Sequence, residues 1–341
     1  MTVPLIVRAA RCEAVARTPV WLMRQAGRYL PEYKQVRARV TFEEAIADAD
    51  VAAELTLQPV RRFGVDGAVV FSDIMAPLGA MGVQVAFAPG PVLEPLVLDD
   101  RLGGLHVAEG PFATAAAIRR VRAELGAGER PGVIGFCGAP VTLAAYLLEG
   151  GGSKDFLALR VAAGREPERL HRLLDTLSDG MSCYLAAQVD AGADILQIFD
   201  SWAGVLSVTQ YEDFAAEPTR RLVAAARATG VPVVYFAPAA HHLARRVARL
   251  GADVVGVDWR RPLGAQWAEL PPGTAIQGNV DPAALLAGPA AAASAARKVL
   301  AEAAGRPGHI LNLGHGVDQH TPVEAVAALV TATRAVVPCA T

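Results

Sequence analysis

Residues 195–201 read Ile-Leu-Gln-Ile-Phe-Asp-Ser, a short, mostly apolar run that ends in a carboxylate and a hydroxyl. Seven further short apolar runs, bounded by Gly, Pro or Asp and separated by longer amphipathic stretches, occur at residues 20–23, 68–71, 133–136, 233–237, 254–257, 275–278 and 310–313. Runs that are apolar on both faces are typical of parallel strands covered by helices. Eight strand-helix units in one chain favour a closed (β/α)8 barrel of the TIM type over an open doubly wound sheet.

The sequence therefore predicts an α/β protein with one barrel domain over residues 1–341 and one small insertion. Near residues 83–97, two short apolar runs flank a Pro-Gly-Pro turn, which is typical of a hairpin. Two long uncharged stretches, residues 74–93 and 131–148, are broken by Gly and Pro. We expect them to be loops joining short elements, since a membrane span needs about 20 apolar helical residues.

Composition argues against several classes of partner. The formal net charge of −2, from 32 basic and 34 acidic residues, provides no global field for nucleic acid or an anionic membrane. The four cysteines, Cys12, Cys137, Cys183 and Cys339, form no CxxC pair, so neither a zinc site nor a disulfide framework is expected. The apolar stretch 3–7 is too brief for a signal-peptide core, which favours a cytoplasmic location.

Polar residues follow the apolar runs, where the active site of a parallel barrel is built. In chain order they are Arg24, Gln25, Gly27 and Arg28; Ser72 and Asp73; Cys137 and Gly138; Asp200 and Ser201; Asp258 and Trp259; Asn279 and Asp281; Gly314, His315 and Gly316. The first forty residues also carry eight basic side chains against two acids. Because arginine binds carboxylate or phosphate through a planar fork, an anionic substrate is indicated.

One long segment points to a known family. Residues 21–33, Trp-Leu-Met-Arg-Gln-Ala-Gly-Arg-Tyr-Leu-Pro-Glu-Tyr, resemble the N-terminal signature of the uroporphyrinogen decarboxylase family. Further matching motifs, in the family's order, are Phe-Ser-Asp-Ile at 71–74, Gly-Phe-Cys-Gly-Ala-Pro at 135–140, Phe-Asp-Ser-Trp-Ala-Gly at 199–204, Gln-Gly-Asn at 277–279 and Asn-Leu-Gly-His-Gly at 312–316. The resemblance covers almost the whole chain.

The resemblance implies an activity and a site. The activity is loss of carbon dioxide from the four acetate side chains of uroporphyrinogen III, an anionic cyclic tetrapyrrole, to give coproporphyrinogen III in haem biosynthesis. It implies a carboxy-lyase with no metal or organic cofactor, paired as a homodimer. The implied substrate-binding residues are Arg24, Gln25, Ala26, Gly27, Arg28, Asp73, Tyr146, Phe199, Ser201 and His315, and the implied catalytic residues are Asp73, Arg24 and Arg37.

Each implied role has a chemical sense. Arg24, Arg28 and Arg37 would face substrate carboxylates, and Asp73 the pyrrole nitrogens. Tyr146 and Ser201 would face a side-chain carboxylate, His315 the far rim, and Phe199 would help form the apolar wall. A pyrrole protonated at a ring carbon is its own electron sink, so no cofactor is needed, and a carboxylate in an apolar cavity would stabilise the resulting cation.

Other interpretations of these residues stay open. Asp73 is also suited to capping the helix that follows it, Tyr146 to packing in the core, and His315 to a phosphate-binding loop. His241 and His242 are adjacent and have no third ligand at suitable spacing, which favours structural roles.

The same superfamily includes zinc-dependent methyltransferases that act on corrinoid proteins or thiols, but no cysteine here lies two residues after a histidine. A non-catalytic tetrapyrrole-binding protein and a phosphate-binding lyase are further alternatives. The chain departs from the family at Pro238 and Ala239, where a lysine-glycine pair is common, and over residues 317–321.

Overall fold

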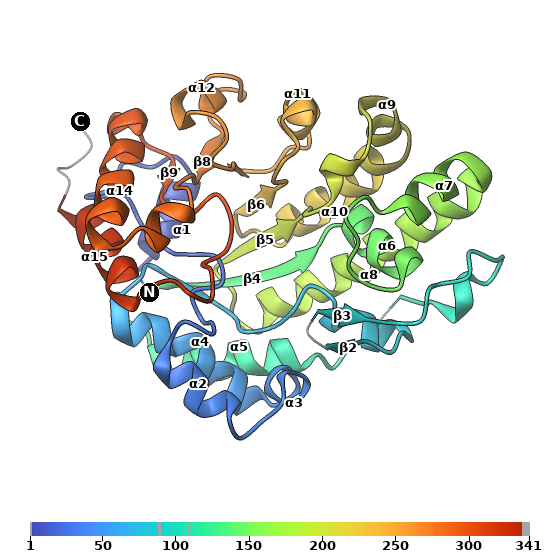
Figure 1. Ribbon diagram of the computed structural model, residues 1–341, viewed down its shortest axis with the longest axis horizontal. Coiled ribbons are helices and arrows are strands. Elements are labelled where there is room, and N and C mark those ends of the chain that lie inside the picture. Colours follow the sequence, from blue (N-terminus) through green and yellow to red (C-terminus); the bar gives the residue numbers. More distant parts are fainter. Residues whose placement is uncertain (1, 88–89, 108–109, 336–341) are drawn as a thin grey trace.

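The computed structural model describes residues 2–87, 90–107 and 110–335, and its centre is a curled sheet of seven parallel strands (Figure 1). In spatial order the strands are β1 (Gly67–Val69), β4 (Gly132–Gly138), β5 (Ile195–Phe199), β6 (Val233–Phe236), β7 (Val254–Gly256), β8 (Ala275–Gln277) and β9 (His309–Ile310). Seven of the eight predicted runs thus form one sheet in chain order, and the predicted α/β fold class is confirmed.

The first predicted run closes the ring without forming a strand. Val20 makes one parallel bridge to Leu311, which also donates its N–H to the carbonyl of Pro19 (2.9 Å). On the other side, the N–H of Asp66 donates to the carbonyl of Val20 (2.7 Å). The prediction of a full strand was wrong because Pro19 has no N–H to donate and the Val20 N–H goes to the Asp66 side chain (2.9 Å).

That side-chain bond is one of three, which we call the aspartate clasps. In each, an aspartate just before a strand accepts the N–H of a residue entering the neighbouring strand or run and also pairs with an arginine. The clasps are Asp66 with Val20 and Arg17, Asp194 with Val133 and Arg130, and Asp253 with Val233 and Arg227. The amino-terminal end of the sheet is therefore held by side chains as well as by the backbone ladder.

The same end of the barrel is closed by apolar packing. Helix α1 (Leu5–Ala10) buries Ile6 completely against one residue from near the start of each of six strands, namely Ile134, Ile195, Val234, Val254, Ala275 and Ile310. In the interior, Trp21 Nε1 donates to Gln277 Oε1 (2.9 Å), and Gln277 Nε2 donates to Gln197 Oε1 (3.0 Å). Because this end is filled, ligand access is left to the carboxyl ends of the strands.

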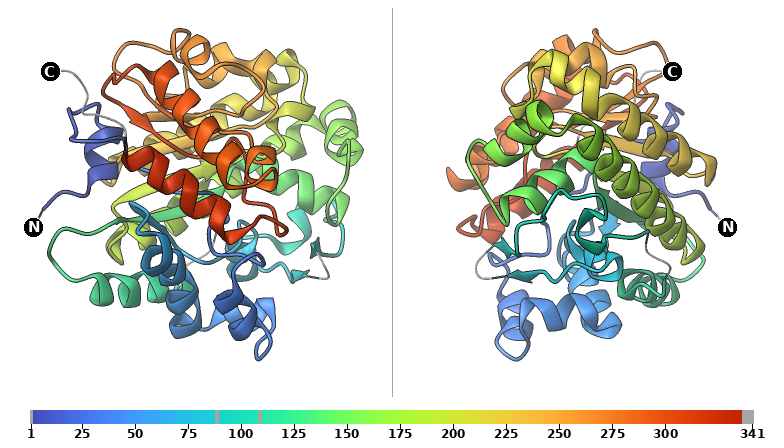
Figure 2. Two further views of the ribbon diagram at one scale, coloured as in Figure 1. Left: turned by 60° about the vertical axis from the view of Figure 1, so that its left-hand side comes forward. Right: turned by 90° about the vertical axis from the view of Figure 1, so that its right-hand side faces the viewer.

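Helices surround the sheet, as Figures 1 and 2 show, and in Figure 2 the two C-terminal helices α14 and α15 lie side by side. The other helices are α2 (Pro31–Arg37), α3 (Phe42–Ala47), α4 (Ala49–Phe63), α5 (Ala113–Leu125), α6 (Pro140–Glu149), α7 (Leu157–Arg165), α8 (Pro167–Asp190), α9 (Val208–Gln210), α10 (Ala216–Ala228), α11 (Ala244–Val247), α12 (Leu263–Trp267) and α13 (Ala283–Leu286), with α14 over Pro289–Ala303 and α15 over Val323–Arg334. The longest, α8, buries Leu170, Leu173, Leu174 and Leu177, the i, i+3, i+4, i+7 pattern of an amphipathic helix. No helix of the described ranges is long and apolar enough to cross a membrane.

Short helical turns fill the connections at the carboxyl ends of the strands. They are η1 (Ala76–Met81), η2 (Leu102–Gly104), η3 (Ala203–Val205) and η5 (His241–Leu243), together with one π-helical turn, η4 (Tyr211–Ala215). The expectation that residues 131–148 form a loop was wrong: they hold β4 and most of α6, since Gly138 ends the strand and Pro140 opens the helix.

The predicted hairpin is present but short. Strands β2 (Ala86–Phe87) and β3 (Pro91–Val92) pair antiparallel, with Phe87 opposite Pro91. Residues 88 and 89 of the predicted turn lie outside the described residues. Val92 also bridges Gly151, which ties the insertion to the end of α6.

The clasps predict a large effect of one substitution on stability. Arg130 is 5% exposed, so Asp194→Ala would leave a buried, unpaired guanidinium and an unsatisfied Val133 N–H. We expect the free energy of unfolding, measured by urea denaturation, to fall by about 3–5 kcal/mol. Asp155→Ala, at an exposed aspartate, should change it by less than about 0.5 kcal/mol, and equal effects of the two would contradict the clasp.

Candidate active site

The loop after the closing run is anchored from within by Gln25. Its Oε1 accepts the N–H of Leu22 (3.0 Å), its Nε2 donates to the carbonyl of Gly67 (2.8 Å), and its own carbonyl accepts the Tyr29 hydroxyl (2.8 Å). Gln25 is only 1% exposed. The structure therefore uses its side chain to hold the loop, and the predicted direct contact of Gln25 with substrate stays a prediction.

Arg24 is presented to solvent by this anchored loop. Its φ of 61° lies in the left-handed region, which costs a non-glycine residue about 1–2 kcal/mol. Its side chain runs across Gly316, where an added Cβ would lie 2.4 Å from Arg24 Cδ. Glycine at this position therefore lets the guanidinium stem cross the loop after β9. Gly27 is similarly close to Arg24, since a Cβ there would lie 3.0 Å from the Arg24 carbonyl oxygen.

Asp73 lies just beyond β1, and its two carboxylate oxygens have different surroundings. Its Oδ1 accepts the N–H of Met75 (2.8 Å), which fixes the turn before η1, but Asp73 does not cap this helical turn, whose N-cap is Met75 without a side-chain cap bond. Within the described residues, Oδ2 accepts no hydrogen bond and is available to a ligand. Burial raises the pKa of Asp73, whereas the Met75 N–H and the Arg24 guanidinium lower it. Arg24 and Asp73 follow neighbouring segments of the barrel, since the run at Val20 lies beside the start of β1, and their charges are close enough to interact.

Tyr146 joins this group from α6. Its ring packs edge-on against Phe156 (centroids 5.6 Å apart) and Trp202 (6.1 Å). Burial raises the pKa of the Tyr146 hydroxyl, nearby Asp73 raises it further and Arg24 opposes them. Core packing and access to the mouth are thus both features of this half-buried side chain.

The apolar wall comes from the end of β5. Phe199 lies edge-on to Phe136 (5.6 Å) and Phe236 (6.3 Å). Strand β5 ends at Phe199, and the next residue, Asp200, turns to Thr142 and Tyr235. Asp200 is fully buried.

Asp200 is therefore a structural residue, although its place after a strand suggested the rim. It accepts hydrogen bonds from the hydroxyls of Thr142 (2.7 Å) and Tyr235 (2.5 Å), and burial raises its pKa to about 6. Thr142 in turn accepts the N–H of Trp202 (3.1 Å). This chain of bonds fixes the loop that carries Ser201.

His315 lies in the glycine-flanked loop after β9, beside the Arg24 side chain that crosses Gly316. A Cβ on Gly314 would lie 2.5 Å from the backbone nitrogen of Trp259, so the loop packs directly on the segment after β7. Although the ring is open to solvent, desolvation by the surrounding protein lowers the pKa of His315, and Arg24 and Arg260 lower it further. His315 therefore lies within electrostatic reach of both arginines.

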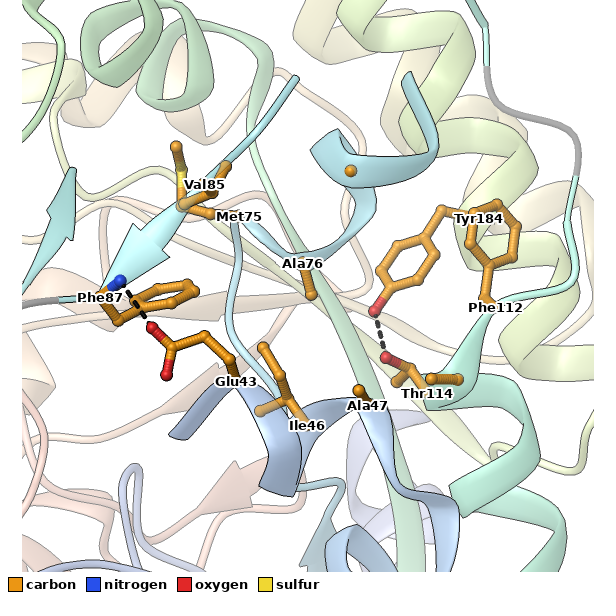
Figure 3. Close-up of a pocket in the computed structure, with 12 residues that line it drawn as sticks. Glu43, Ile46, Ala47, Met75, Ala76, Val85, Phe87, Phe112, Thr114 and Tyr184 are labelled. Atoms are coloured by element: carbon orange, nitrogen blue, oxygen red, sulfur yellow. Dashed lines mark hydrogen bonds between the residues drawn. The ribbon is translucent and has the colours of Figure 1, made fainter. Parts of the chain in front are cut away.

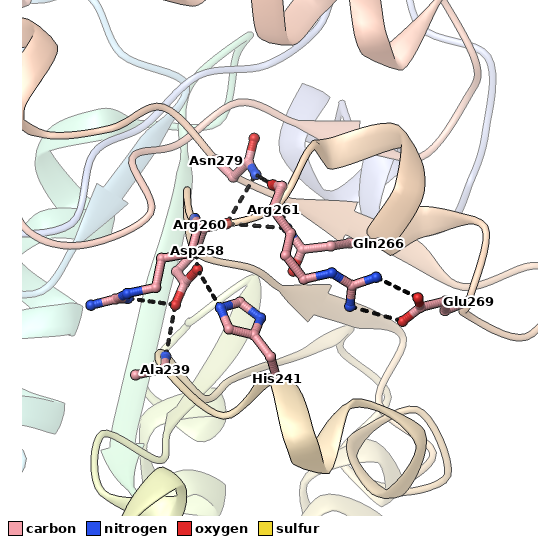
Figure 4. A network of polar contacts seen from close by, with 8 residues as sticks. All are labelled: Ala239, His241, Asp258, Arg260, Arg261, Gln266, Glu269 and Asn279. Atoms are coloured by element: carbon pink, nitrogen blue, oxygen red, sulfur yellow. Dashed lines mark hydrogen bonds and ion pairs between the residues drawn. The ribbon is translucent and has the colours of Figure 1, made fainter.

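The segment after β7 is organised by Asp258 (Figure 4). Its carboxylate accepts the N–H of Ala239 (2.7 Å) and pairs with Arg260 (2.7 Å) and His241 (3.1 Å). Ala239 has a φ of 57°, a conformation that suits the glycine common in the family at this position. Alanine at position 239 therefore adopts a left-handed conformation that costs a non-glycine residue about 1–2 kcal/mol.

Arg28 and Arg37 lie further out. Arg28 is exposed and close enough to Asp318 to help lower the pKa of that carboxyl, after the His320 N–H. Arg37, at the end of α2, donates to the carbonyl of Val40 and stands 5.7 Å from the centroid of the Phe42 ring. Roles for Arg28 and Arg37, and for half-buried Ala26, stay predictions.

A cavity of about 250 Å³ lies between α3, η1, β2 and the start of α5 (Figure 3). Met75, Phe87, Phe112 and Tyr184 are among the residues that line it, and the Tyr184 hydroxyl donates to Thr114 (2.8 Å). Arg24, Asp73, Tyr146 and His315 are not among the residues that line it.

Within residues 2–87, 90–107 and 110–335, no group of three His, Cys, Asp or Glu side chains could hold a metal ion. His242 contacts the carbonyl of Leu206 (2.8 Å) and His241 contacts Asp258 (3.1 Å), as expected for structural histidines. Cys12, Cys137 and Cys183 are free thiols, and Cys339 lies outside the described residues.

The ring of parallel strands, with its amino-terminal end filled and polar side chains following the strands at the other end, defines a TIM-barrel-like protein. The family model described as uroporphyrinogen decarboxylase (URO-D) matches residues 1–336, and the chain belongs to this family.

Curated relatives agree. The chain is 45% identical over 335 residues to the uroporphyrinogen decarboxylase of Chloroflexus aggregans, covering 95% of this chain and 93% of that one. It is 44% identical over 333 residues to that of Myxococcus xanthus, covering 96% and 94%. Among solved structures, a methyltransferase from Methanosarcina mazei superposes with a TM-score of 0.81 at 20% identity over 98% of this chain and 99% of that one, which shows the shared fold.

The electrostatic coupling across the mouth predicts a shift that NMR can measure. Removing the positive charge of Arg24 by Arg24→Gln should raise the pKa of His315, because a neighbouring cation disfavours the protonated ring. Titration of the histidine ring protons would report it. Buried His309, whose pKa is lowered to about 4 by desolvation, is the internal control and should not move. An unchanged His315 pKa would show that Arg24 does not face this loop.

Proposed function

We propose that this protein is a uroporphyrinogen decarboxylase, a carboxy-lyase that converts the four acetate side chains of uroporphyrinogen III to methyl groups and releases four CO2. The observation that carries the proposal is that Asp73, just after β1, keeps one carboxylate oxygen free of protein hydrogen bonds within the described residues, while the exposed Arg24 follows the neighbouring run. Membership of the family supports the same substrate class.

In this proposal the macrocycle lies over the mouth with its pyrrole N–H groups directed at Asp73. Arg24 and Arg28 bind acetate and propionate carboxylates, and Tyr146 and Ser201 bind a further side-chain carboxylate. Phe199 supplies part of the apolar wall, and His315 the far rim. Each charge-assisted bond to a carboxylate would contribute about 1.5–3 kcal/mol. The loop residues Gln25, Ala26 and Gly27 complete the binding surface.

The chemistry needs a place for an electron pair. Protonation of a pyrrole ring carbon gives an iminium-like cation, and the bond between the acetate methylene and its carboxylate then breaks. CO2 leaves, the electron pair neutralises the ring, and a second proton completes the methyl group as the ring carbon loses its own. Arg24 and Arg37 are the cations that we assign to the reacting acetates. No step uses a metal or an organic cofactor.

Asp73 would stabilise the cationic ring. Desolvation makes a carboxylate in such a site more effective than one in water, and the fixed Met75 N–H holds it in place without reorganisation. One preorganised contact contributes about 3–4 kcal/mol, whereas enzymes lower barriers by about 8–23 kcal/mol. Binding of the carboxylates, exclusion of water and proton delivery would have to supply the remainder.

The proposal includes three further features that rest on the family resemblance. The chain would fold as one barrel domain, pair as a homodimer and work in the cytoplasm. The shared fold is compatible with the methyltransferase alternative, but a shared fold alone does not establish which reaction a protein catalyses. A tetrapyrrole carrier without chemistry would need the same carboxylate contacts and would differ only in turnover.

The proposal is tested by anaerobic incubation of the metal-stripped protein with uroporphyrinogen III, followed by chromatography of the oxidised products. We expect stepwise loss of four carboxylates per molecule. A folded protein that binds the substrate and leaves all eight carboxylates in place would contradict the decarboxylase and support the carrier.

Asp73→Asn tests the stabilising role, because it keeps the shape of the side chain and removes its charge. We expect kcat to fall by about 10²–10³, with a much smaller change in KM. Asp155→Asn, at an exposed carboxylate, is the matched control and should keep full activity. Near-normal turnover by Asp73→Asn would show that the carboxylate charge is not needed.

A further inference from the structure

Two consecutive arginines after β7 point to opposite sides of the chain (Figure 4). Arg261 forms an ion pair with Glu269, which follows α12, and both side chains are partly open to solvent. Arg260 turns the other way, toward Asp258. Arg261 is therefore engaged in a surface ion pair, whereas Arg260 is held by a different carboxylate, that of Asp258.

Arg260 is held rigidly. Its backbone N–H donates to Asp258 Oδ1 (3.0 Å), its Nη1 donates to Asp258 Oδ2 (2.7 Å), and its guanidinium lies 4.3 Å from the centroid of the Trp259 ring. Burial alone would raise the pKa of Asp258, but the N–H groups of Ala239 and Arg260 and the charge of His241 hold it below its usual value. The carboxylate that orients Arg260 is therefore ionised at neutral pH.

The same guanidinium lies at the mouth. Gly314 packs on Trp259, and Arg260 is one of the two cations that lower the pKa of His315. Arg260 therefore lies directly after the segment on which the loop of His315 packs. Its side chain is 45% exposed, and within the described residues its Nε and Nη2 groups donate to no protein acceptor. Those donors form a fork that suits a carboxylate.

We propose that Arg260, oriented by Asp258 and Trp259, binds a substrate carboxylate beside His315 and so fixes the rotation of the macrocycle over the mouth. This inference rests on the proposed function, since it takes the ligand to be a polycarboxylate ring. A ring whose carboxylates are contacted only from the side of Arg24 and Arg28 could tilt out of the mouth. A further cation from the loop after β7 adds a contact that opposes this tilt.

The test compares KM and kcat of Arg260→Gln, Arg260→Lys and Arg261→Gln with those of the wild type. Arg260→Gln should raise KM for uroporphyrinogen about tenfold or more, the loss of one charge-assisted bond, with kcat within about twofold. Arg260→Lys, which keeps the charge and loses the fork, should lie between. Arg261→Gln, whose side chain faces Glu269, should behave as the wild type.

A second readout separates binding from a merely structural role. Raising the ionic strength screens charge contacts, so KM should rise with salt in the wild type and rise less steeply in Arg260→Gln, which has one cation fewer. Equal KM values and salt slopes in Arg260→Gln and Arg261→Gln, with an active wild type, would overturn this inference and leave the decarboxylase standing. So would a fall in kcat at unchanged KM. If Arg260→Gln fails to fold, Arg260→Lys decides by the same criteria. An inactive wild type would instead overturn the proposed function.

Discussion

The closure of the barrel at Val20 is the constraint on which the site depends. The run that contains Val20 makes no ladder of its own and is held by one bridge to Leu311 and by the side chain and N–H of Asp66, with Arg17 paired to the same carboxylate (2.6 Å). Arg24 follows only four residues later. Because the clasp fixes where the run ends, it also fixes where the loop that presents Arg24 begins.

The charged residues at the two ends of the barrel have different partners. At the amino-terminal end, three aspartates accept hydrogen bonds from backbone N–H groups and form ion pairs with arginines. Their charges are therefore neutralised within the protein. At the carboxyl end, only one oxygen of Asp73 accepts a hydrogen bond from the described residues, and Asp258 forms an ion pair with Arg260. Glycines at 314 and 316 let Trp259 and Arg24 pack against the same loop. The mouth thereby gathers charges that are oriented by the protein and available to a ligand, which is the preorganisation that catalysis on a charged intermediate requires.

Much of this could be predicted from the sequence, since apolar runs and the polar residues after them report the strands and the mouth. The sequence pattern does not predict the direction in which individual side chains point. Gln25 follows a strand-like run yet turns inward to bond Gly67, and Asp200 turns to Thr142 and Tyr235. Arg260 and its neighbour look equivalent in sequence, and only the positions of Asp258 and Glu269, set by tertiary packing, distinguish them.

In the proposed function, the tetrapyrrole binds with its ring centre over Asp73. The most direct measurement is a crystal structure of the protein with the reduced product, coproporphyrinogen III, bound under anaerobic conditions. The account predicts that the free carboxylate oxygen of Asp73 faces the ring centre and lies about 2.7–3.2 Å from pyrrole nitrogens. A macrocycle bound with its nitrogens turned away from Asp73, or bound outside the mouth between Asp73 and His315, would contradict it.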